Sequence, residues 1–264
     1  MTVASEPERP VEATAIHTGI LRCTLSADDS QVYWAHCPPR SNQEPSEPAS
    51  RRNLRAFEER WFGSKSQARV KSLLAVLSTR FDPHPRAVET LRAWRGMSPV
   101  TRRILCHWHL QFVDPLYRRF SAELLPDRRV GPRDTIDRDV ISRWVETQAS
   151  GRWSAATRAA FGTKLLSTAV EAGLVQARGT TRQLVLPRVE DDALVYLLRW
   201  LGTVRYDGTL VANPYLASVG LTGAAVDERL HAIPGLFYRR AGDVIELDWR
   251  APWPTRALEG AHAS

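Results

Sequence analysis

Few residues of this chain are of types that could carry out catalysis. Their positions in expected helices give a structural reason for their presence. Asp137 and Asp139 form one acidic pair, and residues 190–192, Glu-Asp-Asp, form another cluster. Each group falls at an expected helix start, where the helix dipole stabilises carboxylates. His107 and His109 are two residues apart, so on a helix they point to nearly opposite sides and cannot share a metal ion.

Sequence motifs of the common enzyme classes are absent. The chain has no P-loop, no nucleophile elbow, no zinc-protease motif and no glycine-rich dinucleotide loop after a strand. Its three cysteines, Cys23, Cys37 and Cys106, are widely separated and lack C-x-x-C spacing, so a disulfide framework is not expected. We therefore expect a non-enzymatic protein with no catalytic residue, no metal site and no cofactor.

A second group of residues has the chemistry of nucleic-acid contact. Arg binds phosphate through two parallel N–H groups, and Lys, Ser and Thr also donate to phosphate oxygens. Such residues gather in one stretch of the chain. The candidates for DNA contact are Arg152, Ser154, Thr157, Arg158, Lys164, Arg178, Thr180, Thr181 and Arg182.

Two predicted helices would position the first of these candidates. Apolar residues at three- and four-residue spacing predict an amphipathic helix over 137–148. Ser154 is a good N-cap for a second helix over 155–172, because its hydroxyl can accept from a free N–H of the first turn. Gly173 stands where a left-handed C-cap is favoured.

A β-hairpin should follow these helices. Two short β-type runs, 174–178 and 182–186, are joined by the turn 179–181. Helix, turn, helix and hairpin are the elements of a winged helix-turn-helix, whose second helix enters the major groove while the wing contacts the backbone. Winged helices can also serve only as protein-protein modules, so protein contact is the alternative use of the same surfaces.

The region after residue 189 repeats this order in a diverged form. Helices are expected over 190–201, 213–219 and 222–233, and strands over 236–240 and 244–249. Thr222 is the expected cap of the third helix. Asp227 and Glu228 lie on that helix and disfavour DNA readout there, so packing or partner binding is the expected role of this second unit.

Composition favours an anionic partner. The chain of 264 residues has 36 Lys and Arg against 29 Asp and Glu, a formal net charge of +7, with a sequence pI near 9.8. Apolar residues make up 43% and there are nine tryptophans, which argues against global disorder. The segment 51–133 is the most basic part, and phosphate binding and a solvated surface both stay open for it.

These patterns predict a mainly α protein: a helical N-terminal domain followed by tandem winged helix-turn-helix units with small β-hairpin wings. The expected divisions are 1–50 as tail, small element and linker, with the tail reaching about residue 13, then 51–133 as a basic helical domain, 134–189 as a winged helix-turn-helix, 190–250 as a second, diverged winged-helix-like unit, and 251–264 as a tail. No signal-peptide pattern and no run of apolar residues long enough to span a bilayer is visible, so a cytoplasmic location without membrane contact is expected.

The run from Ile104 to Val175 resembles the BrxA family of BREX phage-exclusion systems. The residues that carry the resemblance are WHLQF at 108–112, YRRF at 117–120, ISRW at 141–144, SAATR at 154–158 and EAGLV at 171–175. The resemblance implies a small, mainly helical accessory protein without a cofactor. Such a protein binds DNA and works beside a methyltransferase, an ATPase and a phosphatase-like component in phage defence.

The resulting hypothesis is a DNA-binding accessory protein that docks on duplex DNA through Arg-rich surfaces and a winged helix. Its expected partners are double-stranded DNA and other phage-defence proteins. The alternative is a protein-protein adaptor that assembles a defence or regulatory complex without touching DNA.

Overall fold

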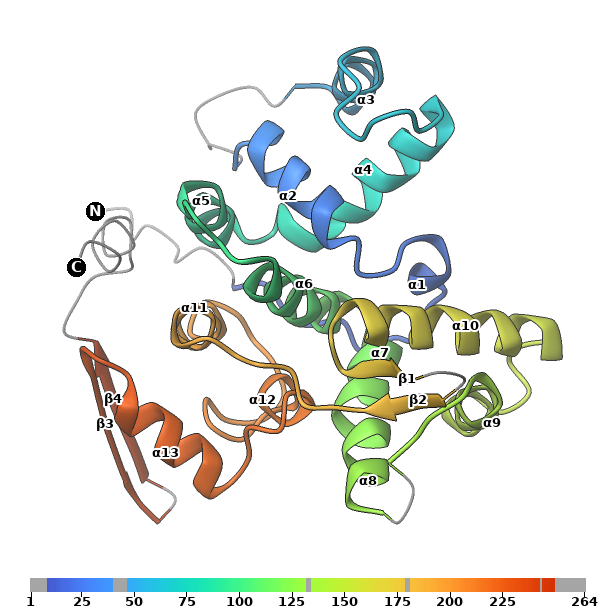
Figure 1. Cartoon of the computed structure of the whole chain (residues 1–264). Helices are drawn as coiled ribbons and strands as arrows, with labels where there is room; N and C mark the ends of the chain where they lie inside the picture. Colours follow the sequence, from blue (N-terminus) through green and yellow to red (C-terminus); the bar gives the residue numbers. More distant parts are fainter. Residues whose placement is uncertain (1–8, 40–46, 132–133, 179–180, 243, 250–264) are drawn as a thin grey trace, which may run out of the picture.

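The computed structural model describes residues 9–39, 47–131, 134–178, 181–242 and 244–249. Within these ranges the chain is mainly helical and has two small antiparallel hairpins (Figure 1), so the mainly α class expected from the sequence is confirmed. None of the helices in these ranges combines the length and the apolar character that crossing a bilayer requires.

Helix α6 (Pro99–Val113) lies at the centre of the molecule (Figure 1). Ser98 caps it by accepting a hydrogen bond from the Thr101 N–H, and Pro99 fits the first turn because no amide donor is needed there. Residues 104–112 are all buried, as expected for a helix that is surrounded on every side. Its neighbours are α2 (Ala27–His36), α4 (Gln67–Phe81), α7 (Pro115–Arg119) and α11 (Asp191–Leu201).

The N-terminal region belongs to the core. The short helix α1 (Gly19–Arg22) and α2 bring the fully buried side chains of Ile20 and Tyr33 into it. Residues 10–13 are not the tail expected from the sequence, because the Glu12 N–H donates to the Arg205 carbonyl and the Ala13 N–H donates to the Phe112 carbonyl, both at 2.9 Å. No local pattern could reveal pairing across such separations.

Further helices complete this helical part. Helices α3 (Ala49–Glu58) and α5 (Pro85–Ala93) lie beside α4 and α2 respectively. After α6, Pro115 starts α7, and Asp114 caps it by accepting from the Tyr117 N–H at 2.9 Å. The chain then continues through the π-helix η1 (Phe120–Leu124) and α8 (Leu125–Val130), which extend α7 as one column in Figure 1.

The first hairpin unit, residues 134–178 and 181–184, contains the elements expected for a winged helix. They are α9 (Arg138–Gln148), α10 (Ala155–Glu171), β1 (Val175–Arg178) and β2 (Thr181–Leu184). Asp137 caps α9 by accepting from the Val140 N–H at 2.7 Å. In Figure 1 α9 is seen nearly end-on while α10 runs lengthwise, so the two helices cross at a large angle.

A third stretch of extended chain joins this hairpin. Thr135 forms an antiparallel bridge with Gln183. Ile136 donates to the Arg182 carbonyl at 2.9 Å, and the Leu184 N–H donates to the Asp134 carbonyl at 2.7 Å. The strand that precedes α9 therefore pairs with β2, which fixes the hairpin relative to the start of α9.

The second hairpin unit, residues 191–242 and 244–249, has the expected order of elements. After α11 come α12 (Pro214–Ser218), α13 (Ala224–Ala232), β3 (Leu236–Ala241) and β4 (Val244–Trp249). The expected cap of α13 is wrong, since Gly223 and not Thr222 occupies the N-cap position. Arg205, in the segment between α11 and α12, bridges Val11 in the N-terminal region and does not join β3 and β4.

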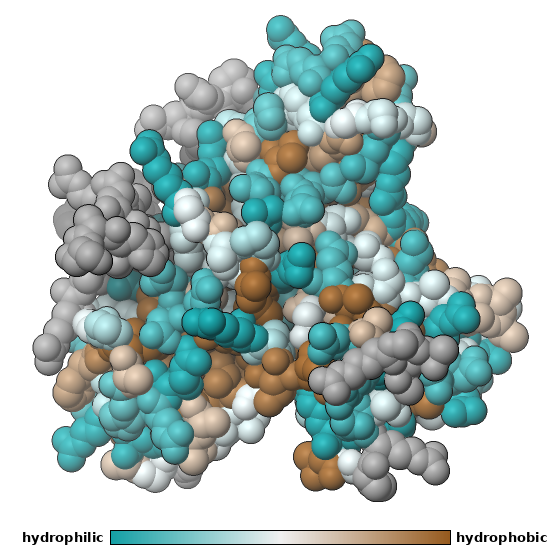
Figure 2. Space-filling model, in the orientation of Figure 1, coloured by the Kyte–Doolittle hydropathy of each residue, from teal (hydrophilic) through white to brown (hydrophobic). Residues whose placement is uncertain are grey.

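One hydrophobic core runs through all of these parts. Its buried side chains form a single cluster that extends from Ile20 to Tyr238. The divisions expected at 133/134 and 189/190 therefore coincide with changes of element, while the core continues across them. Figure 2 shows a mostly hydrophilic surface with apolar patches between the two hairpin units, and the right-hand end of α10 is pale brown.

Candidate nucleic-acid interface

A close approach of α9 and α10 sets the geometry of the candidate interface. A Cβ atom at Gly162 would lie 2.7 Å from the carbonyl oxygen of Arg138, which is shorter than any real contact of this type. Glycine is therefore required where the two helices cross, although it weakens a helix intrinsically. On the same helix Phe161 is fully buried and lies 4.5 Å from the Trp153 ring, centroid to centroid. These contacts hold the start of α10 in place.

Three of the candidate residues lie at the N-terminal end of α10. Ser154 is the N-cap, as expected, and accepts from the Thr157 N–H at 3.2 Å. Arg152 is exposed, with its guanidinium carbon 5.3 Å from the centre of the Trp153 ring. The free N–H groups of the first turn and an exposed cation thus stand together, an arrangement suited to an anion such as a phosphate.

Arg158 has a different environment from the one expected. Its Nη1 atom lies 2.9 Å from Glu146 Oε2 and donates to the Trp153 carbonyl at 2.7 Å. Glu146 also accepts from the Gly151 N–H at 3.2 Å through its other oxygen. Arg158 therefore ties the turn between α9 and α10 together, and its charge is already paired. This pair could not be predicted from local spacing, because Glu146 lies twelve residues away on another helix.

Lys164 is exposed near the middle of α10. Among the residues that the structure describes, none forms an ion pair with it. Its neighbours on the exposed side are small: Ala156, Ala159, Ala160, Thr163 and Ser167. Small side chains allow a helix to approach a groove closely, and a single free cation among them can reach a phosphate.

The C-terminal end of α10 is held against other parts of the fold. Gly173 has φ +78°, which is the left-handed conformation expected for the C-cap. Leu165 and Ala169 are fully buried, and Glu171 accepts from the Ala27 N–H at 2.9 Å. Helix α1 also packs on α10. The C-terminal end of α10 is therefore anchored to the rest of the fold, and the exposed candidates lie between its start and Lys164 near its middle.

The wing residues can be placed only in part. Thr180 and the side chains of Arg178 and Thr181 lie outside the described residues. Arg182 is half-buried, and its backbone carbonyl accepts from the Ile136 N–H at 2.9 Å. Strands β1 and β2 pair in the register Val175 with Leu184 and Arg178 with Thr181, and they lie between α10 and α9 in Figure 1.

Many cations of the helical part have structural partners. Arg118 donates to the carbonyls of Gln111 and Ala13, and Arg129 donates to the carbonyl of Val185. Arg102 forms an ion pair with Asp28 at 2.7 Å. These guanidinium groups are thus engaged within the fold, which weakens the case for a phosphate-binding patch there.

The buried histidines have no arrangement that suggests catalysis or metal binding. His107 Nδ1 lies 2.8 Å from the Tyr117 hydroxyl, whereas His109 Nε2 lies 2.7 Å from the Tyr196 hydroxyl. Burial lowers the pKa of His107 to about 3 and that of His84 to about 4, so both are neutral at physiological pH. Within the described part of the chain no group of three or more His, Cys, Asp or Glu could hold a metal ion.

Comparisons with known proteins give a fold likeness alone. No family model and no curated protein matches the sequence. A solved structure described as an uncharacterized protein from Magnetospirillum magneticum is similar over 70% of this chain and 93% of that chain. Its sequence identity is 15% and the TM-score is 0.54. At this identity the likeness supports the mainly helical fold and carries no function with it.

Proposed function

We propose that this protein binds duplex DNA without enzymatic activity, with α10 entering the major groove and the β1–β2 hairpin acting as the wing. The observation that carries the proposal is the exposed N-terminal half of α10, which stands beside a hairpin tied to the strand before α9. Arg152, Ser154 and Thr157 lie at the end that such motifs present to DNA, and Lys164 lies further along the same helix.

The first test is the affinity of the full chain for a short random-sequence duplex across a salt series. Binding through phosphate contacts should weaken as salt increases, with a log–log slope of about −0.9 for each phosphate neutralised. No binding even at low salt would count against the proposal and would favour protein contact.

A charge-reversal pair locates the interface. The variant carrying Arg152→Glu and Lys164→Glu should lose DNA affinity by about tenfold or more and should show a shallower salt slope. The matched control is Arg86→Glu together with Arg103→Glu, which makes the same change in net charge at exposed positions on α5 and α6. Equal losses in the two variants would show that net charge, and not α10, accounts for binding.

The adaptor alternative has one observation in its favour. The exposed start of α10 carries the alanines Ala155, Ala156, Ala159 and Ala160, which form a small apolar surface suited to packing against a protein. Replacing Ala156 and Ala160 by Glu would disrupt either use. The adaptor predicts loss of a co-purifying protein, and no DNA affinity in the native chain or in the variant, because it makes no DNA contact.

We further propose that the DNA contact serves a BREX-like phage-defence system in the cytoplasm. This step rests on the sequence resemblance of residues 104–175 to the BrxA family. A host whose defence system lacks this protein should regain phage resistance with the native chain. It should not regain resistance with the Arg152→Glu, Lys164→Glu variant. Full rescue by that variant would separate defence from DNA binding through α10.

A further inference from the structure

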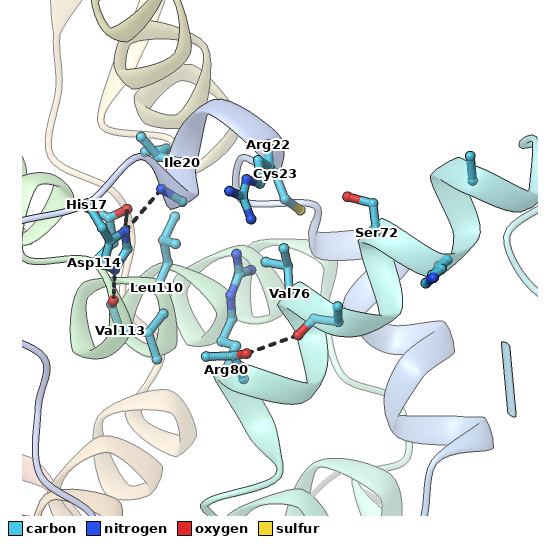
Figure 3. Close-up of a pocket in the computed structure, with 15 residues that line it drawn as sticks. His17, Ile20, Arg22, Cys23, Ser72, Val76, Arg80, Leu110, Val113 and Asp114 are labelled. Atoms are coloured by element: carbon cyan, nitrogen blue, oxygen red, sulfur yellow. Dashed lines mark hydrogen bonds and ion pairs between the residues drawn. The ribbon is translucent and has the colours of Figure 1, made fainter. Parts of the chain in front are cut away.

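A pocket lies between α1, α4 and the end of α6, away from the candidate DNA surface. Its volume is about 500 Å³, within the range of small-molecule sites, and no residue of α10 lines it. Figure 3 shows the side chains from these three elements converging on it, with His17 and Asp114 at one end and Ser72 toward the other. The pocket is formed by residues far apart in the sequence.

The middle of the pocket is apolar. Ile20 and Leu110 are buried beneath it, and Val76 and Val113 are half-buried at its wall. Ala75 is exposed and also lines it. A ligand that occupies this space must therefore bring a hydrocarbon body, since an entirely polar molecule would leave its hydrogen-bonding groups unpaired.

Cations dominate the remaining lining. Arg22 and Lys71 are exposed at the pocket. Within the described residues, neither of them has an ion-pair partner. The two cations therefore add positive charge to the lining that no ion pair within the described residues offsets. An anionic group in the pocket would meet favourable electrostatics there.

Arg80 adds a buried cation to the same wall. It is fully buried, and its two Nη atoms donate only to backbone carbonyls, to Leu25 at 2.6 Å and to Thr24 at 3.0 Å. Its Nε atom has no partner, and no carboxylate of the described chain lies within ion-pair distance of it. A buried charge without a counter-ion is costly, and an anionic ligand would offset that cost.

One acidic residue, Asp114, lines the pocket. Asp114 is 1% exposed, and burial raises the pKa of its carboxyl. One oxygen caps α7, and the other lies 3.8 Å from His17 Nδ1. The lining thus brings three cations, Arg22, Lys71 and Arg80, against this one carboxyl, so its formal charge is positive.

We propose that this pocket binds a small organic anion with an apolar body, such as a medium-chain carboxylate. The anionic head is drawn to the cations of the lining, Arg22, Lys71 and Arg80, and the chain lies across Val76, Leu110 and Val113. Octanoate has the required composition and a volume well below that of the pocket. This site is separate from the proposed DNA contact and does not depend on it.

The test is calorimetric titration of the full chain with octanoate, octylammonium and acetate. Octanoate should bind at least about tenfold more tightly than octylammonium, which has the same chain and the opposite charge, while acetate should show no binding. Equal binding of octanoate and octylammonium, or no binding of octanoate, would overturn the proposal.

Two variants place the bound anion in this pocket. Ala75→Trp fills the apolar middle and should abolish octanoate binding, whereas the matched Ala93→Trp on α5 should not change it. Lys71→Glu should weaken octanoate binding by about tenfold and should reduce the difference in affinity between octanoate and octylammonium. Octanoate binding that survives both Ala75→Trp and Lys71→Glu would place the ligand elsewhere and refute the assignment. This experiment does not measure DNA affinity, so either proposal can fail without the other.

Discussion

The two hairpin units share an order of elements and differ in how the helix before the hairpin is used. In the first unit, α10 has 17 residues, and its capped N-terminal end is exposed. In the second, α13 has 9 residues, and Asp227 on it accepts from the Tyr238 hydroxyl of β3 at 2.5 Å. Asp227, which disfavours DNA contact in the second unit, therefore binds the hairpin of that unit.

The strands before the helix pairs diverge as well. In the first unit Thr135 pairs with Gln183 of the hairpin, whereas in the second unit Arg205 pairs with Val11 of the N-terminal region. The second unit is further joined to the core by His107, which lies 2.9 Å from Ser218 of α12. The same order of helices and strands can thus produce one unit whose helix α10 is exposed at its start and one unit that is attached to the N-terminal region and to α6.

The largest difference between the two units should be their loss of stability in acid. Burial lowers the pKa of His107 from 6.5 to about 3, so below pH 6.5 the unfolded chain takes up a proton that the folded protein does not. Stability therefore falls as pH decreases from about 6.5 to about 3, by on the order of 4 kcal/mol for this group. The sequence of the first unit contains no histidine. Hydrogen exchange should show α12 losing protection before α9 and α10.

The control for this prediction removes the titrating group. His107→Gln keeps polar atoms near Tyr117 and Ser218 but cannot take up the proton, so the stability curve between pH 7 and pH 3 should flatten. His231→Gln changes an exposed histidine of α13 and should leave the curve as it is. An unchanged pH dependence in His107→Gln would show that another group controls acid unfolding.

The crossing of α9 and α10 should be the most sensitive point of the first unit. Gly162→Val places side-chain atoms against the Arg138 carbonyl, so the helices must separate, at a cost of about 1–3 kcal/mol. Chemical denaturation measures the loss. Ala160→Val, on the exposed side of the same helix, should cost less than about 1 kcal/mol. Equal losses of stability in the two variants would mean that α9 and α10 do not approach each other as closely as the structure shows.

Local signals in the sequence were sufficient for much of the first unit. Ser154 caps α10 and Gly173 ends it, as predicted, because caps depend on a few adjacent residues. Groups brought together from distant parts of the chain could not be predicted. The pair of Glu146 with Arg158 and the pocket around Arg80 depend on helix placement, which no spacing within one helix encodes.

Substitution of Arg158 should distinguish its role from that of Lys164. Arg158→Met removes a partly exposed ion pair with Glu146, so the expected loss of stability is about 0.2–1 kcal/mol. A double-mutant cycle with Glu146→Gln measures the coupling. DNA affinity should stay within about twofold in Arg158→Met and should fall severalfold in Lys164→Met. The reason is that, of these two residues, Lys164 has no ion-pair partner within the described structure, whereas Arg158 is paired with Glu146. The reverse pattern would return Arg158 to the DNA-contact set.

The smallest effect is expected at Asp227 in the second unit. The hydrogen bond from Tyr238 lowers the pKa of the Asp227 carboxyl, and Arg240 lowers it further. Its contribution to stability is therefore present above the pKa of the unfolded chain, 3.8, and is lost as pH falls through the lower pKa of the folded protein. Asp227→Asn should slightly lower the melting temperature at pH 7, and this effect should shrink as the pH falls below 3.8. Because the carboxyl is engaged with Tyr238 and Arg240 of its own hairpin, DNA affinity should not change. A gain of DNA affinity on removing this acid would instead mean that α13 lies near the DNA, and the contrast between the two units would not hold.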